Sequence, residues 1–469
     1  MSTEHESQSL KGRRKKGKAL RQEVAFSSHG EWTPAFDRPD PISLLQAQDV
    51  GRIKDLLPIR YGRMLESPFA FLRGSAVVMA SDLAGTPTTG IQTILCGDAH
   101  LSNFGVFASP ERKLIFDIND FDEAYPGPWE WDLKRLAASA VVAGRENGFK
   151  EKKCRALAVD LTRKYAQAMD RFSQAHTLDV WYFHVEADAV VEVFDRASKR
   201  GKKRAAKQLK KARRKTHQLT MEKLTHFEDS RRHINSNPPL LVPIREWGLE
   251  KILSEDDLRT QTKQNVEDAW SQYLESLPDE RRFLLQRYQI RDGALRVGGV
   301  GSVGTHCIIL LLEGQAEDDA LILQLKEAGP SVLESYLTER RYKDHAHRVV
   351  TAQRLMQAVS DIFLGWHTSK LSGRNFYWRQ LKDMKGSAEV SEMDYDNLRT
   401  YLGVCAVCLA RAHARTGDGA SISGYIGKKD SFPKAIGDFA AAYADQTERD
   451  YQALVDAVQS GRIAAETGI

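Results

Sequence analysis

The sequence predicts an α+β fold with two lobes, a small antiparallel β lobe over residues 291–390 and a larger helical lobe built from the segments on both sides. Residues 291–328 contain three β-rich segments, joined by a glycine cluster and by the polar turn GQAEDD, which is the pattern of an antiparallel meander. Residues 131–143 and 152–172 show helical periodicity, and helical patterns dominate up to the meander. They dominate again after residue 390.

Four segments follow from this pattern. Residues 1–40 are polar, basic and turn-rich, and we expect a flexible segment there. Residues 41–290 form a helical lobe that carries a polar loop region and a basic insertion at 196–215. Residues 291–390 form the β-rich lobe, and residues 391–469 supply the helical remainder of the large lobe.

Several local patterns complete the prediction. Residues 77–83, 93–107 and 113–125 have the pattern of strand or loop pieces around polar clusters. After the meander we expect a helix over 331–360. Two further strands are then predicted, IFLGWHT and NFYWRQLKD.

Composition excludes several classes of protein. The chain is 42% hydrophobic and 28% charged, which is typical of a globular protein. Its longest apolar run, 307–312, is far shorter than the roughly 20 residues of a membrane-spanning helix. The basic N-terminus lacks the apolar stretch of a secretory signal, so we expect no membrane partner and a cytoplasmic location. Five cysteines form no disulfide framework, and Cys405 and Cys408 are predicted to pack inside a helix.

The basic insertion has two interpretations. Between residues 196 and 215, twelve of twenty positions are Lys or Arg and none is acidic. Such a block could bind nucleic acid. It is also compatible with a solvated helix whose apolar stripe is Ala205, Ala206, Leu209 and Ala212. We favour the helix, because no aromatic residues interleave to stack on bases.

The most informative segment is GDAHLSNF, which begins at Gly97. It places Asp98 and Asn103 five positions apart after a β-rich run, and the chain returns with Asp120 in FDINDFDE. Phosphoryl transfer needs a carboxylate that orients the acceptor hydroxyl and oxygen ligands that hold Mg²⁺ against the phosphates. Asp98 is therefore the candidate base, with Asn103 and Asp120 as candidate metal ligands.

The pattern G-D-x-H-x-x-N, followed by D-F-D-E and W-D-L, resembles the catalytic and metal-binding loops of aminoglycoside phosphotransferases and related kinase-like enzymes. The resemblance implies that Asp98 is the catalytic Asp, that Asn103 and Asp120 bind metal, and that Asp132 is structural. It also implies ATP and Mg²⁺ as cofactors. From about Arg60 to Ala444 the chain is similar to the uncharacterised bacterial domain-of-unknown-function family numbered 2252.

A second candidate element is the glycine cluster, with its candidate cofactor-binding residues Gly299, Gly301, Ser302 and Gly304. A lone G-x-G-x-x-G is a weak signal. Here the run passes into a strand and then into LILQLKEA, which carries Lys326. Kinases have the same arrangement: a glycine loop joins two strands, and a lysine lies on the strand that follows. In them the backbone N–H groups of the loop cover the phosphates, and the lysine contacts the phosphates. The alternative for Lys326 is a surface lysine on an edge strand.

The order of these elements is unusual for a kinase. The glycine loop and lysine follow the catalytic loop by about two hundred residues, whereas in ordinary kinases they precede it. We therefore predict a kinase-like fold in circularly permuted order. The segment LARAHARTGD at 409–418 resembles the helix that normally runs into the catalytic loop, which places the permutation point between it and Gly97. His413 and His100 would then lie near the active site.

Four assignments are less constrained by the sequence. His100 is a catalytic candidate by position, although packing or loop bracing is favoured over proton transfer. Glu334 is the first choice for the carboxylate that pairs with Lys326, with Glu339 and Gln353 as alternatives. Asp122 could join the metal site, because residues two apart on a strand share a face, while Asp117 would point away. Arginines at 60, 63 and 73 could form an anion site near the catalytic loop, or surface salt bridges.

The expected reaction is transfer of the γ-phosphoryl group of ATP to a hydroxyl of a small-molecule acceptor. A second enzymatic possibility is an adenylyltransferase, in which the same fold holds ATP in reverse and attaches AMP. A third is a non-catalytic module that binds nucleic acid through residues 196–215.

Overall fold

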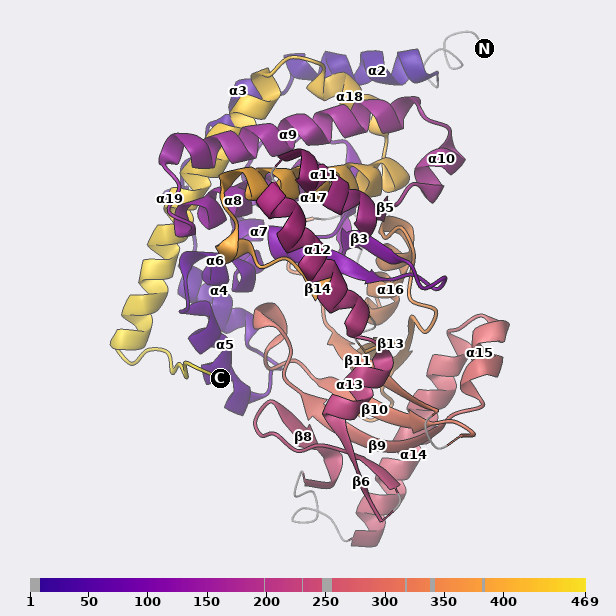
Figure 1. The fold of residues 1–469 in the computed structure, drawn as a ribbon. Helices are drawn as coiled ribbons and strands as arrows, with labels where there is room; N and C mark the ends of the chain where they lie inside the picture. The colour runs from indigo at the N-terminus through magenta and orange to yellow at the C-terminus, as the bar shows by residue number, and fades with distance from the viewer. Residues whose placement is uncertain are drawn as a thin grey trace.

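The computed structural model describes residues 9–197, 199–229, 231–246, 255–316, 319–337, 342–381 and 384–469. Within these ranges the chain is a mixed α+β protein, with a β-rich region at one end and a helical region at the other (Figure 1). The predicted fold class is confirmed at that level. No helix within these ranges combines the length and the apolar character that a bilayer-spanning segment requires.

Six strands form one antiparallel sheet: β8 (Leu241–Pro243), β9 (Gln289–Arg296), β10 (Cys307–Glu313), β11 (Ala320–Ala328), β12 (Gly365–Thr368) and β13 (Asn375–Gln380). Their order across the sheet is β12-β13-β11-β10-β9-β8. The predicted meander is confirmed as β9, β10 and β11, which pair consecutively. Lys326 of β11 lies opposite Cys307, the first residue of β10. The lysine is therefore beside the glycine turn that joins β9 to β10.

Helices cover the sheet. The helix α16 (His345–Met356) packs against β11, β12 and β13, and α14 (Glu255–Glu275) packs against β12. A short helix, α15 (Asp279–Leu285), follows α14. Tyr273 of α14 stacks on Trp378 of β13 with ring centroids 4.2 Å apart. This stacking places α14 against the sheet, and β8 joins the sheet by pairing with β9. The sheet and its cover thus include elements that precede residue 291. Helical periodicity predicts which face of a helix is buried, but it does not show against which lobe the helix packs.

The predicted helix over 331–360 is much shorter than expected. Among the described residues of this range, 331–337 and 342–360, only His345–Met356 is helical, with Asp344 as its N-cap, and residues 332–336 form turns. The backbone N–H of Ser331 binds the carboxylate of Glu334 at 3.1 Å, and that of Val332 binds Glu123 at 2.7 Å. These side chains hold the segment in a local turn that competes with a helix.

Five helices form the centre of the helical region: α8 (Glu130–Glu146), α9 (Glu151–Gln174), α17 (Tyr395–Thr416), α18 (Gly419–Ile426) and α19 (Ser431–Gln459). The long helix α9 contacts each of the other four. The two helices predicted at 131–143 and 152–172 are thus confirmed as α8 and α9. Cys405 and Cys408 are buried on α17, as the prediction of helix packing requires.

The N-terminal residues that the structure describes are folded onto this bundle, which corrects the prediction of a flexible 1–40 segment. The helices are α2 (Leu10–Ala19) and α3 (Phe26–Gly30), and α2 packs along α18. Gly17 permits this approach, because a side chain there would collide with the backbone of Ser421. Arg21 donates to the carbonyls of Gly424 and Tyr425 at 2.7 Å. Residues 1–8 of the predicted segment lie outside the described residues.

Four short helices follow: α4 (Pro41–Gln48), α5 (Leu57–Met64), α6 (Pro68–Gly74) and α7 (Ala76–Ala84). The last of them overturns the prediction of a strand or loop at 77–83. Met79, Ala80 and Leu83 are buried at helical spacing, so packing of one helix face outweighs the strand preference of the two valines.

Short strands surround the polar loops. They are β1 (Gln92–Leu95), β2 (Phe104–Ala108), β3 (Leu114–Ile118), β4 (Tyr125–Pro128), β5 (Val185–Glu186), β6 (Thr225–Glu228), β7 (Arg231–Ile234) and β14 (Gly386–Ser387). β1 pairs with β4, β6 pairs with β7, and the others form a sheet in the order β14-β2-β3-β5. The strand or loop pieces predicted at 93–107 and 113–125 correspond to β1, β2 and β3.

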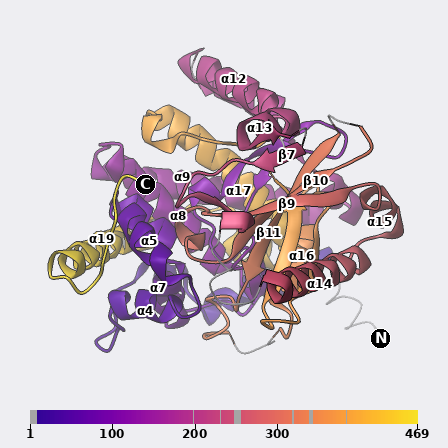
Figure 2. The same cartoon turned by 90° about the horizontal axis from the view of Figure 1, so that it is seen from below.

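The basic insertion is helical. It holds α12 (Lys199–Arg214) and the end of α11 (Ala187–Ala197). The helix α10 (Thr177–Tyr182) precedes it, and α13 (His217–Leu224) follows it. Figure 2 shows α12 projecting at the edge of the molecule. Leu209 and Ala212 of its predicted apolar stripe are buried, whereas Lys203, Lys207 and Lys210 are exposed. The helix prediction is confirmed, and nucleic-acid binding stays a prediction.

Candidate active site

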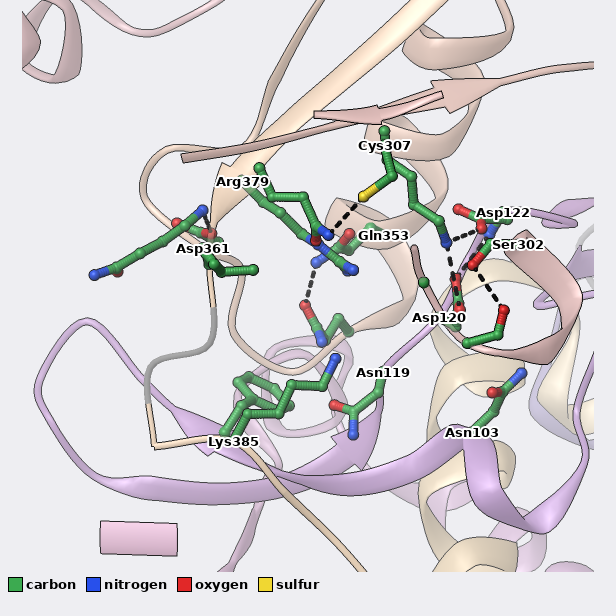
Figure 3. A pocket seen from close by; sticks show the side chains of 18 of the residues that line it. Asn103, Asn119, Asp120, Asp122, Ser302, Cys307, Gln353, Asp361, Arg379 and Lys385 are labelled. Carbon is green, nitrogen blue, oxygen red and sulfur yellow. Dashed lines mark hydrogen bonds and ion pairs between the residues drawn. The ribbon is translucent and has the colours of Figure 1, made fainter. Parts of the chain in front are cut away.

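A cavity of about 1040 Å³ lies between the six-stranded sheet and the loops that follow β1 and β3 (Figure 3). Its lining includes nine of the predicted site residues: Asp98, His100, Asn103, Asp120, Asp122, Gly299, Gly301, Ser302 and Lys326. Two predicted residues, Gly304 and Glu334, are not part of the lining. Segments about two hundred residues apart in the chain therefore share one cleft.

The loop after β1 is held by Asp132 of α8. Its carboxylate accepts hydrogen bonds from the backbone N–H groups of Cys96 at 2.7 Å and Gly97 at 3.0 Å. Gly97 has φ +80°, and a side chain there would collide with the carbonyl of Glu123. Only glycine meets both requirements without strain. The turn fixes the direction in which Asp98 leaves the strand.

Asp98 is anchored on one side. Arg135, one turn after Asp132 on α8, donates to Asp98 Oδ1 from Nε at 2.9 Å and from a terminal nitrogen at 2.7 Å. Asn103 donates through Nδ2 to the backbone carbonyl of Asp98 at 2.6 Å, which leaves Asn103 Oδ1 available to a ligand. Asp98 Oδ2 is 3.6 Å from His100 Nε2. The base candidate is therefore oriented by a guanidinium that sequence reasoning missed.

His100 has the geometry of a brace. Its Nδ1 accepts from the backbone N–H of Ser102 at 3.2 Å, and burial lowers the pKa of the ring to about 4. The ring is therefore neutral at neutral pH, with its proton on Nε2 facing Asp98. This arrangement favours positioning of the loop over proton transfer.

A lysine and two carboxylates meet in the cavity. Lys326 Nζ contacts Asp122 Oδ2 directly and lies 3.7 Å from Asp120 Oδ2. Tyr377 of β13 donates to Asp122 Oδ1 at 2.7 Å. Burial alone would raise the pKa of Asp120, but the positive charges of Lys326 and Arg379 outweigh it and hold that pKa at about 2. Burial lowers the pKa of Lys326, and the two carboxylates more than reverse this, so the lysine stays charged.

The glycine turn presents open backbone to the cavity. A Cβ built on Gly299 would have no neighbouring atom within 4 Å, and one on Gly301 would have only the carbonyl of Arg73, at 3.7 Å. Ser302 Oγ donates to the carbonyl of Gly299 at 3.2 Å and closes the turn. Gly304 lies outside the lining. It has φ +87° and packs on Arg52.

The structure does not bring Glu334 to Lys326. Its carboxylate binds the backbone of Ser331 and lies 3.5 Å from His345 Nδ1 and 3.7 Å from Arg348 Nε. The segment is a turn and not the predicted helix, so the carboxylate is directed elsewhere. The alternative from the sequence, Gln353 of α16, does line the cavity and donates to Gln357 at 2.8 Å.

Two other predicted neighbours are structural. Asp117 points away from the cavity, as expected, and forms a buried ion pair with Arg411 at 2.7 Å. His413 of α17 lies 3.3 Å from Asp132 and bonds to Tyr165 at 2.8 Å. It therefore supports the carboxylate that holds the Gly97 turn.

The oxygen donors in the cavity fit a magnesium ion. The ammonium group of Lys326 already occupies a cation position beside Asp120 and Asp122. The described residues contain no group of three or more His, Cys, Asp or Glu side chains that could hold a metal by themselves. A metal here would use two carboxylates, the Asn103 oxygen and ligand phosphates, and Mg²⁺ sites often combine few protein ligands with phosphate in this way.

A protein-family model described as an uncharacterized protein conserved in bacteria, DUF2252, matches residues 52–457. The chain belongs to this family. The DUF2252 match spans the glycine turn, Lys326, both acidic loops and His413, so it includes all the predicted site residues that line the cavity. Neither the curated proteins nor the solved structures contain a match to the chain.

Proposed function

We propose that this DUF2252 protein is an ATP-dependent phosphotransferase that moves the γ-phosphoryl group to a hydroxyl of a small-molecule acceptor. The observation that carries the proposal is the contact of Lys326 with Asp120 and Asp122 in a cavity bordered by an open glycine turn. Kinases combine a glycine-rich loop, a strand-borne lysine, and an Asp and an Asn that hold metal. All four kinds of residue line this cavity.

The order of elements in the sheet supports a kinase-like small lobe. The glycine turn joins β9 to β10, β11 carries the lysine, and α16 follows and packs on that strand. Protein kinases place a Glu from the corresponding helix against the lysine. Here α16 presents Gln353, and Asp122 supplies the direct carboxylate contact of Lys326.

A circular permutation is supported by contacts between segments that are distant in the chain. His413, near the end of α17, meets Asp132, which holds the turn before Asp98. In an ordinary kinase-like chain that helix would run directly into the catalytic loop. Here the end of α17 lies against β1, where such a connection would be made.

Each residue then has a role in the reaction. Asp98 orients the acceptor hydroxyl, and Arg135 keeps its carboxylate in place. Lys326 and the N–H groups of the glycine turn hold the phosphates. Bound Mg²⁺ would neutralise the charge that develops on the phosphates. The acceptor oxygen forms a bond to the γ-phosphorus, the bond to the bridging oxygen breaks, ADP leaves, and the hydroxyl proton passes to Asp98.

The experiment that tests this function is ATP consumption by the full-length protein against a library of hydroxyl compounds with Mg²⁺. We expect ADP release that depends on one acceptor class and is lost in Asp120→Asn. Asp279→Asn, a change at an exposed carboxylate of α15, is the matched control and should leave turnover unchanged. Turnover that survives in a folded Asp120→Asn protein would contradict the proposal.

A further inference from the structure

The inner face of the six-stranded sheet carries a second group of cations, distinct from Lys326. Arg296 ends β9 and Arg379 lies on β13, and both side chains line the cavity. Gln324 and Cys307 line it between them. Figure 3 shows Arg379 beside Cys307, on the same side of the cavity.

The strand register places these side chains on one surface. Lys326 pairs with Cys307 on one side and with Tyr377 on the other, and Gln324 pairs with Arg379. Residues two apart on a strand share a face and are separated by about 7 Å. Arg379 and Lys326 therefore stand on neighbouring rows of the same inner face, at a spacing that a short chain of phosphate groups bridges.

Neither arginine has a carboxylate partner within ion-pair distance in the part of the chain that the structure describes. Arg379 Nε donates to Gln324 Oε1 at 3.0 Å, and Gln324 in turn donates to Cys307 Sγ at 3.0 Å. For Arg296 no hydrogen bond or ion pair is formed with a described residue. Burial lowers the pKa of Arg296; the Cys307 thiol raises it, and the nearby charge of Arg379 lowers it further.

Several other arginines in the described residues do have carboxylate or carbonyl acceptors. Arg135 binds Asp98, Arg411 binds Asp117, and Arg348 donates to three backbone carbonyls. Arg296 and Arg379 instead lack a carboxylate within ion-pair distance, although Tyr377, Asp120 and Asp122 outweigh burial and raise the pKa of Arg379. A bound anion would supply the direct partner that both guanidinium groups lack. Guanidinium groups bind phosphate in a bidentate manner.

From this contrast we propose that Arg296 and Arg379 form a phosphate-binding subsite on the sheet side of the cavity. The inference rests on the proposed use of the cavity for ATP and an acceptor. A neutral, flat nucleobase would gain little from this polar and cationic surface, whereas a phosphate group gains two charge-assisted partners.

Two sources can supply that phosphate. The first is an acceptor that itself carries a phosphate group, which would name the substrate class as a phosphorylated alcohol. The second is ATP bound in reverse. In that case the acceptor oxygen forms a bond to the α-phosphorus, the bond to the oxygen that bridges to the β-phosphorus breaks, pyrophosphate leaves, and the hydroxyl proton passes to Asp98.

Calorimetric titration with inorganic phosphate and with pyrophosphate tests the subsite without turnover. We expect binding to the wild type that weakens about tenfold or more in Arg296→Gln and in Arg379→Gln, and is partly kept in Arg379→Lys. Arg291→Gln is the matched control, since this exposed arginine of β9 pairs with Glu313. Equal binding by wild type and both glutamine variants, or no binding by the wild type, overturns the subsite.

Product analysis then assigns the source. Release of pyrophosphate with an AMP-modified acceptor assigns the subsite to ATP, and release of ADP with a phosphorylated acceptor assigns it to the acceptor. Asp120→Asn separates this inference from the proposed function. It should abolish turnover while phosphate binding that depends on Arg379 persists. Circular dichroism of each variant checks that the fold is retained.

Discussion

Thr93 of β1 and Thr416 at the end of α17 share a hydrogen bond between their hydroxyl groups at 2.6 Å, although 323 residues separate them. Thr416 Oγ1 also accepts from the backbone N–H of Ile94 at 3.3 Å. The strand that enters the catalytic loop thus begins where the helix bearing His413 ends. Under the proposed circular permutation, this junction is where a chain in ordinary kinase order would be continuous.

The first prediction concerns this junction. Thr416→Val keeps the shape of the side chain but removes the acceptor for Thr93 and Ile94. We expect a loss of about 1–3 kcal/mol in the free energy of unfolding, because buried polar partners lose their hydrogen bond. Urea unfolding measures it. Thr400→Val is the control, since that hydroxyl bonds within its own helix to the carbonyl of Asp396, and it should lose clearly less.

The second prediction separates two glycines of the same turn. Gly304 has φ +87° and lies against Arg52, so Gly304→Ala should destabilise the fold by about 1 kcal/mol or more. Gly299 faces open space, so Gly299→Val should leave thermal stability nearly unchanged. It should weaken ATP binding, because the new side chain occupies the ligand's space. Equal ATP affinity in wild type and Gly299→Val would remove the turn from the site.

The third prediction concerns Arg135. Removing its guanidinium frees the Asp98 carboxylate, whose orientation it fixes through two hydrogen bonds. In Arg135→Gln we expect kcat to fall roughly 10- to 100-fold, with a small change in KM for ATP. Arg135→Lys restores the positive charge but not the pair of guanidinium N–H donors, so it should recover part of kcat. A change in KM alone would assign Arg135 to nucleotide binding.

The fourth prediction is a pH dependence of stability at His367 of β12. The ring is buried, burial lowers its pKa to about 4, and its Nδ1 accepts from Trp378 Nε1 at 2.7 Å. In the unfolded chain the imidazole titrates near pH 6.5. The unfolded state therefore binds more protons between pH 6.5 and 4, so this contribution to stability is complete above pH 6.5 and is lost as the pH falls through that window.

The size of the effect follows from the pKa difference. At about 1.4 kcal/mol for each pKa unit, the loss in the free energy of unfolding reaches up to about 3 kcal/mol. Chemical unfolding at several pH values measures it. His367→Gln, whose amide oxygen can accept from Trp378, should have a flatter profile than the wild type in that window. Parallel profiles would show that this ring does not titrate on unfolding.

The local acidic and glycine patterns were predicted from the sequence because their chemistry is carried by neighbouring residues. Asp98, Asn103, Asp120 and Lys326 do meet in one cavity. The meander was also predictable, since β-rich segments and polar turns alternate over a short stretch. Asp132 and Arg135 are three positions apart on a helix, so the position of Arg135 on the face that holds the catalytic loop could have been inferred.

Other features depended on tertiary partners that the sequence does not reveal. The turn at 332–336 is held by Glu123, which lies about two hundred residues earlier, and its formation directs Glu334 away from Lys326. The N-terminal helices are fixed by α18 and α19 at the far end of the chain. That Arg296 and Arg379 have no carboxylate within ion-pair distance among the described residues is a property of the assembled cavity, so no local pattern predicts it.

The most direct test of the central claim is equilibrium binding of ATP to the purified protein, with and without Mg²⁺, in the wild type, Lys326→Gln and Asp120→Asn. We predict a single ATP site in the wild type that Mg²⁺ strengthens, with affinity at least about tenfold weaker in Lys326→Gln and with no Mg²⁺ effect in Asp120→Asn. A wild-type protein that does not bind ATP, or folded variants that bind it as the wild type does, would contradict the claim that this cleft is a nucleotide site.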